Sequence, residues 1–226
     1  MRVTIFGGTG YVGSYLVDAL VAAGHRPVLL VRPGSEHKVE HADACDTVSG
    51  DVFDTPAVAR AIEGADAVIF NIGILREDPD SGITFQRMHF DAARQAIDGA
   101  VQAGARRFLL MSANGARADG TDYQRSKLQA EEYLRATDLE WTIFQPSVLF
   151  GDPRGRMEFA SPLKQARDDS PLPAPRFYPR LRPTGAGEFA MSPVHVPDVA
   201  QAFVTALERP DTASQVFRLG GPVAVS

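Results

Sequence analysis

The chain has 226 residues, 44% of them hydrophobic and 23% charged, and its formal net charge is −5 at pH 7. A chain of this length can bury a full core, and the acidic balance without a sustained basic run excludes nucleic acid as an expected partner. The one cysteine, Cys45, excludes an internal disulfide and suits a reducing compartment, so we expect a cytoplasmic protein.

The chain opens with a strand and a helix joined by a glycine-rich turn. The apolar run Val3–Phe6 predicts the strand, and the amphipathic stretch Tyr11–Ala23 predicts the helix. Because the strand starts at Arg2 or Val3, there is no room for a cleaved signal before it, and no apolar run approaches membrane-spanning length. We therefore predict no transmembrane segment, while a peripheral membrane role stays open.

The turn reads Gly7-Gly8-Thr9-Gly10-Tyr11-Val12-Gly13, the pattern of a dinucleotide site. Gly7 allows a tight turn, Gly10 lets the backbone approach a pyrophosphate, and Gly13 lets the helix pack closely on the strand. The phosphates then lie at a helix N-terminus, where free N–H groups and the helix dipole favour negative charge. A glycine turn without a ligand is the alternative, but the flanking strand and helix favour binding. We assign six residues of the turn to the cofactor: Gly7, Thr9, Gly10, Tyr11, Val12 and Gly13.

Strand and helix patterns then alternate, which is typical of βαβ units on a parallel sheet. The further strands are expected at Pro27–Val31, Thr47–Ser49, Ala67–Phe70, Phe108–Met111 and Thr142–Phe144. The further helices are expected at Pro56–Glu63, behind an N-cap at Thr55, and at Phe85–Ala103 and Thr121–Ala136. We predict an α/β fold, a doubly wound parallel sheet of Rossmann type in residues 1–150. Residues 151–226 would form a small C-terminal substrate lobe with a returning strand and helix, not folded independently.

Residues at the strand ends bear on the choice of cofactor. Arg32 stands at the tip of the second strand, where an acidic residue would bind the 2′-hydroxyl of NAD and an arginine can bind the 2′-phosphate of NADP. We therefore expect NADP, with NAD as the alternative because Glu36 could reach back from the next loop. Asp51 could accept a hydrogen bond from the adenine amino group, and Asn71 and Gly73 end the fourth strand at the edge where ligands bind. A solvated arginine, an ordinary loop aspartate and a strand-end turn are the alternatives.

The candidate chemistry lies at Tyr123 and Lys127. They are four residues apart on a predicted helix, so they share one face, and the ammonium can favour the phenolate. A tyrosine tuned in this way can act as a general acid or base at neutral pH. Ser112, at the carboxyl end of the fifth strand, is placed to hydrogen-bond a substrate oxygen beside it.

These residues resemble the short-chain dehydrogenase/reductase superfamily, especially its extended and atypical branches. The combination is most similar to the branch related to the Rossmann-fold accessory subunit of respiratory complex I, with epimerase/dehydratase-like proteins beside it. The matching segments cover nearly the whole chain: the glycine turn, Gly50–Val52, Arg107–Ser112, Tyr123–Lys127, Gln145–Gly151, Val194–Ala200 and Leu219–Pro222.

The resemblance implies roles for individual residues. Tyr123 would be the catalytic acid or base, Lys127 would bind the nicotinamide ribose, and Ser112 would position the substrate. The remaining implied cofactor contacts are Val52, in the matched Gly50–Val52 segment, and Pro146, Ser147 and Val148, along the nicotinamide side.

The chain also departs from the pattern. His89 stands where many relatives carry an active-site asparagine, and it could either bridge a water to Lys127 or cap the core. The sequence ends soon after Pro222, where relatives continue into further helices of a substrate lobe.

Two further clusters remain to be weighed. Residues 151–187 hold seven basic residues against four acidic ones, so an anionic substrate or headgroup could bind there, with solvated loop arginines as the alternative. The arginines concerned are Arg154, Arg156, Arg176, Arg180 and Arg182. His37, His41 and Cys45 recur at intervals of four, but the segment lacks a fourth ligand, so we expect no metal.

Two functions follow from these observations. The first is an NAD(P)(H)-dependent oxidoreductase or epimerase in which Tyr123 and Lys127 assist hydride and proton transfer at a carbonyl or hydroxyl carbon. The second is a non-catalytic, cofactor-bound scaffold or redox-sensing partner, for which association with a respiratory complex stays open. The substrate and the oligomeric state do not follow from the sequence.

Overall fold

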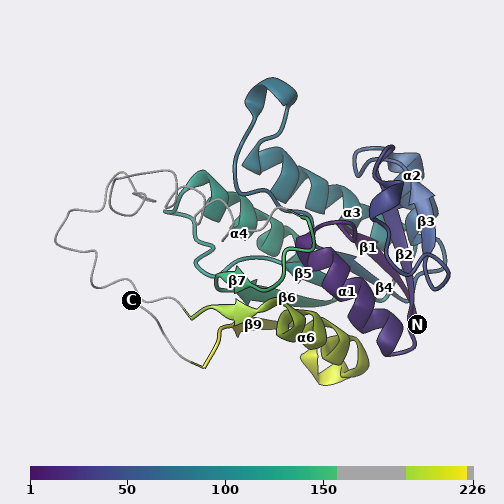
Figure 1. Ribbon diagram of the computed structural model, residues 1–226. Helices are drawn as coiled ribbons and strands as arrows, with labels where there is room; N and C mark the ends of the chain where they lie inside the picture. The colour runs from purple at the N-terminus through teal and green to yellow at the C-terminus, as the bar shows by residue number, and fades with distance from the viewer. Residues whose placement is uncertain (157–191, 223–226) are drawn as a thin grey trace.

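The computed structural model describes residues 1–156 and 192–222 (Figure 1). Seven of its strands form one parallel sheet in the order β3-β2-β1-β4-β5-β6-β9. These strands are β1 (Arg2–Phe6), β2 (Arg26–Val31), β3 (Asp46–Ser49), β4 (Ala67–Phe70), β5 (Arg107–Met111), β6 (Glu140–Pro146) and β9 (Gln215–Leu219). A separate parallel pair joins β7 (Leu149–Phe150) to β8 (Val194–His195).

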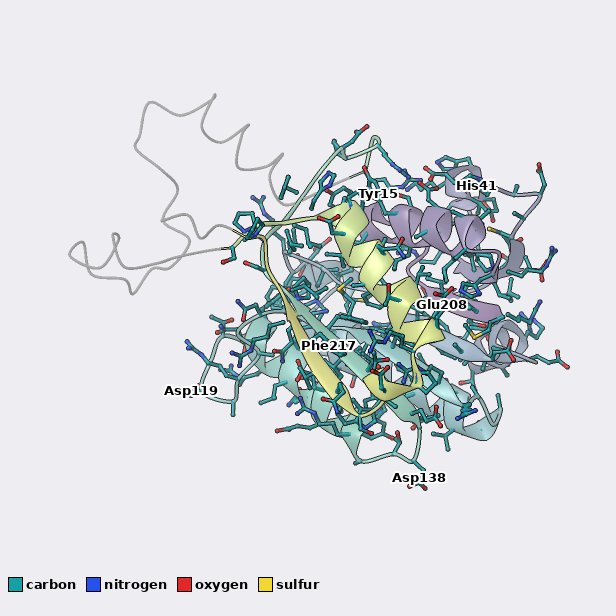
Figure 2. The ribbon with its side chains drawn as sticks, turned by 90° about the horizontal axis from the view of Figure 1, so that it is seen from below. Tyr15, His41, Asp119, Asp138, Glu208 and Phe217 are labelled. Atoms are coloured by element: carbon teal, nitrogen blue, oxygen red, sulfur yellow. The ribbon has the colours of Figure 1, made fainter. Side chains whose placement is uncertain are left out.

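Helices cover both faces of this sheet. On one face α1 packs beside α6, as Figures 1 and 2 show, and on the other α3 packs between α2 and α4. The helices are α1 (Tyr11–Ala22), α2 (Thr55–Ile62), α3 (Ala92–Gln102), α4 (Asp122–Arg135) and α6 (Val196–Glu208). Each face has its own apolar core, with Phe203 of α6 in one and Ile97 of α3 in the other, both fully buried. The predicted doubly wound α/β fold is confirmed.

Two local predictions were wrong. The N-cap of α2 is Asp54, whose carboxylate accepts a hydrogen bond from the Ala57 amide at 3.2 Å, so Thr55 is already helical. Either residue type can cap a helix, and here the carboxylate one residue earlier accepts the hydrogen bond. The predicted helix Phe85–Ala103 is divided into a π-helical segment, Gln86–Asp91, and the α-helix α3.

The parallel strands bring all their carboxyl ends to one edge of the sheet. The order reverses between β1 and β4, and at such a switch point the loops diverge and leave a crevice for ligands. The residues that follow β1, β2, β4, β5 and β6 therefore meet at this edge, although they are far apart in the sequence.

The last described part of the chain returns to the sheet. β9 pairs with β6, and α6 contributes to the core that it shares with α1. Buried Arg107 ties the parts together: its Nη2 donates hydrogen bonds to Thr142 Oγ1 at 2.7 Å and to the Ala206 carbonyl at 2.9 Å. Among residues 1–156 and 192–222, no helix combines the length and apolarity that a membrane crossing requires.

Candidate cofactor-binding and active site

The glycine turn is shaped by close backbone approach. Gly7 adopts a φ of 91°, and a Cβ added to it would lie 3.0 Å from the Asn71 carbonyl carbon and oxygen. A Cβ on Gly13 would lie 2.1 Å from the Gly7 carbonyl oxygen, closer than any real contact. These two positions therefore require glycine for the fold itself.

Gly10 is different, because it is exposed and a Cβ there would meet only the Gly7 oxygen, at 3.3 Å. It is the N-cap of α1, which has no side-chain cap hydrogen bond and no acidic residue in its first turn. This helix start therefore has neither a capping side chain at its N-cap nor an acidic side chain in its first turn. This open cradle fits the diphosphate of a dinucleotide.

At the adenosine end, the predicted contacts lie at the ends of β2 and β3. Arg32 is exposed, and within the described residues its guanidinium makes no hydrogen bond or ion pair. Asp51 Oδ1 accepts a hydrogen bond from the Phe53 amide at 3.0 Å, while Val52 is buried. Arg32 is thus available for an anion, whereas one oxygen of Asp51 already stabilises its own loop.

Two of the arginines proposed for an anionic ligand are already paired. Arg154 Nη1 lies 2.7 Å from Asp18 Oδ2 and its guanidinium lies over the Tyr15 ring, 3.7 Å from the centroid. Arg156 Nη2 lies 2.8 Å from Glu40 Oε1, and its Nε donates a hydrogen bond to the Thr9 carbonyl at 3.1 Å. These arginines clamp the segment after β7 to α1 and the glycine turn, so both already have carboxylate partners and neither is simply solvated.

The other three arginines, Arg176, Arg180 and Arg182, lie outside the described residues. Of the metal candidates, His41 pairs with Asp18 at 2.9 Å and Cys45 is buried. Across residues 1–156 and 192–222, no group of three or more metal-ligating side chains is assembled.

Tyr123 and Lys127 lie on one face of α4, below the ends of β4 and β5. Lys127 is buried, and its Nζ donates a hydrogen bond to the carbonyl of Met111, the last residue of β5, at 3.2 Å. Gly73 lies directly over it, since a Cβ on Gly73 would be 3.5 Å from Nζ. The Tyr123 ring is enclosed by Phe85 and His89, with ring centroids 5.5 and 5.0 Å away. The structure therefore brings both residues to the edge where the cofactor cradle opens.

Burial dominates the electrostatics of this pair. It raises the pKa of Tyr123 to about 12 and lowers the pKa of Lys127 to about 8, with nearby Glu131 opposing part of the latter shift. We expected the ammonium to favour the phenolate, but the phenol is protonated at neutral pH because desolvation penalises the charged form. Tyr123 is thus an acid in this state, beside a lysine that is still largely charged at pH 7.

Ser112 points into a buried polar network. Its Oγ donates a hydrogen bond of 2.5 Å to Glu131 Oε1, which also accepts one of 2.8 Å from Gln145 Nε2. Glu131 is fully buried, and its other oxygen lies 2.8 Å from Arg135 Nη2. The role of Ser112 toward a substrate stays a prediction, and it would require the hydroxyl to leave this network.

The residues after β6 occupy the edge on the far side of Ser112. The Pro146 carbonyl accepts a hydrogen bond from the Asn114 amide at 2.9 Å, and the Ser147 amide donates one to the Leu219 carbonyl at 2.8 Å. The Val148 carbonyl accepts a bond from the Val194 amide at 2.9 Å. Their backbone is fixed by neighbouring strands, and their contact with a nicotinamide stays a prediction.

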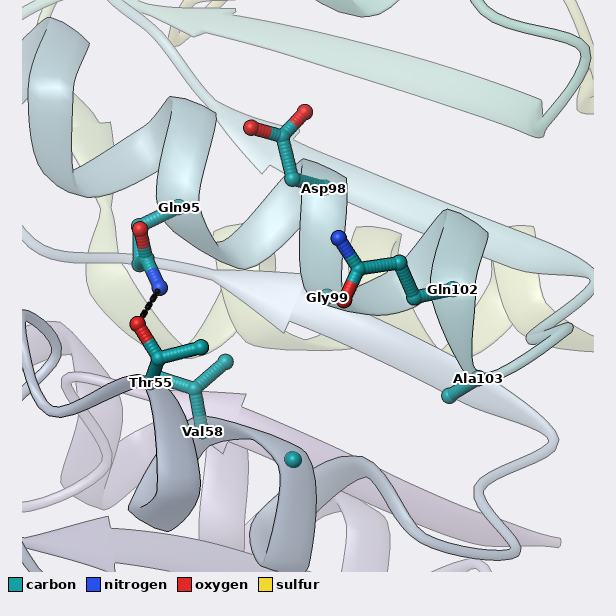
Figure 3. A pocket seen from close by; sticks show the side chains of 8 residues that line it. Thr55, Val58, Gln95, Asp98, Gly99, Gln102 and Ala103 are labelled. Carbon is teal, nitrogen blue, oxygen red and sulfur yellow. Dashed lines mark hydrogen bonds between the residues drawn. The ribbon is translucent and has the colours of Figure 1, made fainter.

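One hollow between two helices lies away from this site. A cavity of about 280 Å³ lies between α2 and α3, and Gln95 Nε2 donates a hydrogen bond to Thr55 Oγ1 at 2.8 Å in its lining. Figure 3 shows these lining side chains. The lining includes Asp98 and Gln102 and none of the residues assigned to the cofactor or to catalysis. This groove is therefore separate from the candidate site.

Comparison with known families agrees with the cradle. Residues 7–171 match the model of the NAD(P)H-binding family, which begins at the first glycine of the turn. The chain belongs to this family. Membership of the NAD(P)H-binding family establishes a nicotinamide dinucleotide as the cofactor class and confirms the resemblance to short-chain dehydrogenases/reductases.

Several characterised proteins are similar over long stretches. A ceramide reductase of Caulobacter vibrioides is 35% identical over 150 residues, which cover 66% of this chain and 46% of that protein. The mitochondrial NADH-ubiquinone oxidoreductase 40 kDa subunit of Neurospora crassa is 26% identical over 226 residues, covering 97% of this chain and 55% of that protein. The chain thus spans about half the length of these relatives.

Solved structures agree on the fold. MoeE5 in complex with UDP-glucuronic acid and NAD superposes with a TM-score of 0.78 at 22% identity, covering 100% of this chain and 78% of that one. The Bordetella bronchiseptica enzyme WbmH in complex with NAD+ gives 0.76 at 18% identity, covering 100% and 77%. At this level of identity the likeness shows the fold alone.

Several participants in the site could not be named from sequence. Glu131, Ser126, Ile74 and Phe85 complete the surroundings of the tyrosine and lysine. Only Glu131 left a signal, because it lies four residues after Lys127 and therefore on the same helix face. The others depend on contacts between separate elements.

Proposed function

We propose that this protein is an NADP(H)-dependent oxidoreductase of the short-chain dehydrogenase type, acting at a carbonyl or hydroxyl carbon. The observation that carries the proposal is that an enclosed Tyr123 and a buried Lys127 lie one turn apart on α4, at the sheet edge where α1 begins. The ammonium of Lys127 has three N–H donors, and one of them bonds the Met111 carbonyl, so donors remain for a ligand's hydroxyl groups. The shifted pKa values of a buried lysine and a half-buried tyrosine favour a role in chemistry over a packing role.

The proposed mechanism assigns the proton to the chain and the hydride to the cofactor. When bound, the nicotinamide supplies or accepts the hydride. In reduction, the Tyr123 hydroxyl donates its proton to the oxygen of the substrate carbonyl as that oxygen becomes an alkoxide. The Lys127 ammonium stabilises the phenolate that remains, and it binds the nicotinamide ribose. The phenol of Tyr123 carries the proton that this step needs at neutral pH. The Lys127 ammonium would have to lower the tyrosine pKa during the reaction, since proton donation is favoured by a pKa near the working pH.

The remaining cofactor assignments belong to the same proposal. The turn residues Thr9, Tyr11 and Val12 would surround the diphosphate, and Asp51, Val52 and Asn71 would lie toward the adenine and its ribose. Residues 1–150 would form the dinucleotide-binding domain, with a small substrate lobe within 151–226. Some relatives are named as mitochondrial, so the cytoplasmic location stays a prediction.

The catalytic role of Tyr123 can be tested by substitution, with a second tyrosine of α4, Tyr133, as the control. NADPH oxidation at 340 nm is measured against a panel of ketones and aldehydes for the wild type, for Tyr123→Phe and for Tyr133→Phe. The control tyrosine donates its hydroxyl hydrogen bond to Asp98 at 2.7 Å, away from the site. We expect Tyr123→Phe to lower kcat by at least about 100-fold, the usual range for loss of a general acid, at unchanged NADPH affinity. Equal kcat for both variants would contradict the mechanism.

The preference for NADP rests on Arg32. We expect the wild type to bind NADPH more tightly than NADH, and Arg32→Ala to lose about tenfold in NADPH affinity while its NADH affinity is unchanged. Titrations that follow nicotinamide fluorescence measure both constants. Exposed Arg60 on α2 provides the matched control, Arg60→Ala. Tighter NADH binding by the wild type would instead assign the ribose to an acidic residue such as Glu36.

Two observations favour the alternative of a non-catalytic, cofactor-bound scaffold. The Ser112 hydroxyl is bonded to Glu131, and one relative is named as the 40 kDa subunit of NADH-ubiquinone oxidoreductase. For a scaffold, NADPH would bind and raise the melting temperature, while Tyr123→Phe would alter neither binding nor any turnover. The two experiments above therefore separate the alternatives.

A further inference from the structure

His89 is buried at the centre of the site, on the π-helical segment Gln86–Asp91. Its Nε2 lies 3.0 Å from the amide nitrogen of Ile74, just beyond β4, and its Nδ1 lies 3.0 Å from the hydroxyl of Ser126 on α4. The Ser126 hydroxyl donates in turn to the Tyr123 carbonyl at 3.0 Å. One side chain thus joins the exit of β4 to the first turn of the helix that carries Tyr123 and Lys127.

The direction of these hydrogen bonds fixes the proton on the ring. The Ile74 amide can only donate, so Nε2 must accept and carries no proton. A neutral imidazole then carries its proton on Nδ1, which donates to the Ser126 oxygen. The Ser126 hydroxyl keeps its own proton for the Tyr123 carbonyl, so every donor in the chain has an acceptor.

The surroundings of the ring oppose a second proton. The ring stacks on Phe85 at a centroid distance of 5.4 Å and meets the Tyr123 ring edge-on at 5.0 Å. The charged group that faces it is Lys127, and burial together with this like charge lowers the pKa of His89 to about 2. With Nε2 already occupied by Ile74, the ring has no free nitrogen with which to pass a proton to Lys127.

We propose that His89 is a positioning residue for Tyr123 and Lys127, fixed as the neutral Nδ1–H tautomer between the Ile74 amide and the Ser126 hydroxyl. Its role toward catalysis rests on the proposed function, but its tautomer and its two bonds do not. The histidine holds the Gly73–Ile74 segment over the ammonium and holds the first turn of α4 against it. It is therefore a brace of the site and not a proton relay.

The ring state is tested by long-range proton–nitrogen correlation spectra of the uniformly nitrogen-15-labelled chain. The His89 signals are assigned by their loss in His89→Gln, with His25→Asn as the control at the opposite edge of the sheet. We expect the Nδ1–H pattern from pH 5 to pH 9, with no titration. An Nε2–H pattern, or titration near the ordinary value of 6.5, would overturn the inference.

The positioning role is tested by two variants that differ in whether they can still accept a hydrogen bond from the Ile74 amide. His89→Gln keeps an acceptor for the Ile74 amide, whereas His89→Leu has about the same volume and no polar atom. We expect amide exchange of Ile74 to accelerate at least about tenfold in His89→Leu and to stay near the wild-type rate in His89→Gln, because only the former leaves the amide without a partner.

NADPH affinity supplies the functional readout, measured where denaturant curves show all variants fully folded. His89→Leu should weaken NADPH binding about tenfold or more by displacing Lys127, and His89→Gln should restore most of it. Wild-type affinity and wild-type exchange in His89→Leu would overturn the proposal. If the wild type binds no NADPH, the proposed function fails, and the tautomer and exchange measurements alone decide on His89.

Discussion

At the scale of single residues, the polar side chains of the site fall into two groups: those proposed to react, Tyr123 and Lys127, and those that form a buried structural network, Ser112 and Glu131. Tyr123 and Lys127 could be placed on one face from their spacing, because the helix period is local. The partner of Ser112 could not be foreseen, since Glu131 lies 19 residues further along the chain and meets the serine only when α4 packs on β5. Spacing thus predicts which side chains share a face, and tertiary packing decides what they contact.

Ser112→Ala tests which role the serine has. Removing the hydroxyl takes one donor from the fully buried Glu131, so we expect the free energy of unfolding to fall by about 1–3 kcal/mol. Urea denaturation measures this loss, with Ser147→Ala, a half-buried serine after β6, measured in parallel. If Ser112 instead serves the substrate, kcat falls with little change in stability, and the structural role of the network would be contradicted.

At the scale of elements, sequence patterns predicted where most strands and helices lie, whereas the exact ends of these elements depend on contacts with other segments. The need for glycine at position 13 is local, because Gly13 packs on Gly7 and Gly8 within the first βα unit. Gly7 also approaches the Asn71 carbonyl after β4, a contact that only the folded sheet creates. The π-helical turn at Gln86–Asp91 had no local signal, since His89 and its bonds to Ile74 and Ser126 come from two other segments. The short strands β7 and β8 were missed because each has only two residues and exists through its partner.

Gly10 and Gly13 offer a test that separates ligand binding from packing. In Gly13→Ala the new methyl group would lie 2.1 Å from the Gly7 oxygen, so α1 must shift and we expect a loss of several kcal/mol, about 2–4, in the free energy of unfolding. In Gly10→Ala the φ of −82° suits any residue and the contact of 3.3 Å is relieved by a small movement.

Gly10→Ala should therefore keep nearly wild-type stability while losing at least about tenfold in NADPH affinity, because the methyl group occupies the approach to the diphosphate. Thermal unfolding and fluorescence titration measure the two effects separately. Unchanged NADPH affinity in a folded Gly10→Ala variant would contradict the assignment of the cradle.

At the scale of the whole molecule, the site is also a liability for stability. The sheet order and the two cores follow from the alternation of elements, so the architecture could be predicted from the sequence. Burial within this site lowers the pKa of both His89 and Lys127, because it disfavours the charged form of each side chain. The pH dependence of folding should therefore report on the site.

His89 contributes to the loss of folding stability at acid pH. Its pKa is about 2 in the folded chain and about 6.5 when unfolded, so between these values the unfolded state binds a proton that the folded state does not. The free energy of unfolding then falls as the pH drops below 6.5, by at most about 1.4 kcal/mol per pH unit from this group. The pKa of Asp46, lowered to about 2 by hydrogen bonds to Arg26 and Arg2, acts only below its ordinary value of 3.8.

The window from pH 4.5 to pH 6.5 therefore isolates the histidines, and urea denaturation across it compares the wild type with His89→Gln. We expect the wild type to lose about 2 kcal/mol more than the variant over this range, because glutamine takes up no proton in either state. His25, whose pKa burial also lowers, is present in both proteins and cancels from the difference. Parallel curves would mean that the folded chain admits the second proton on His89, and Nε2 would then have to release the Ile74 amide.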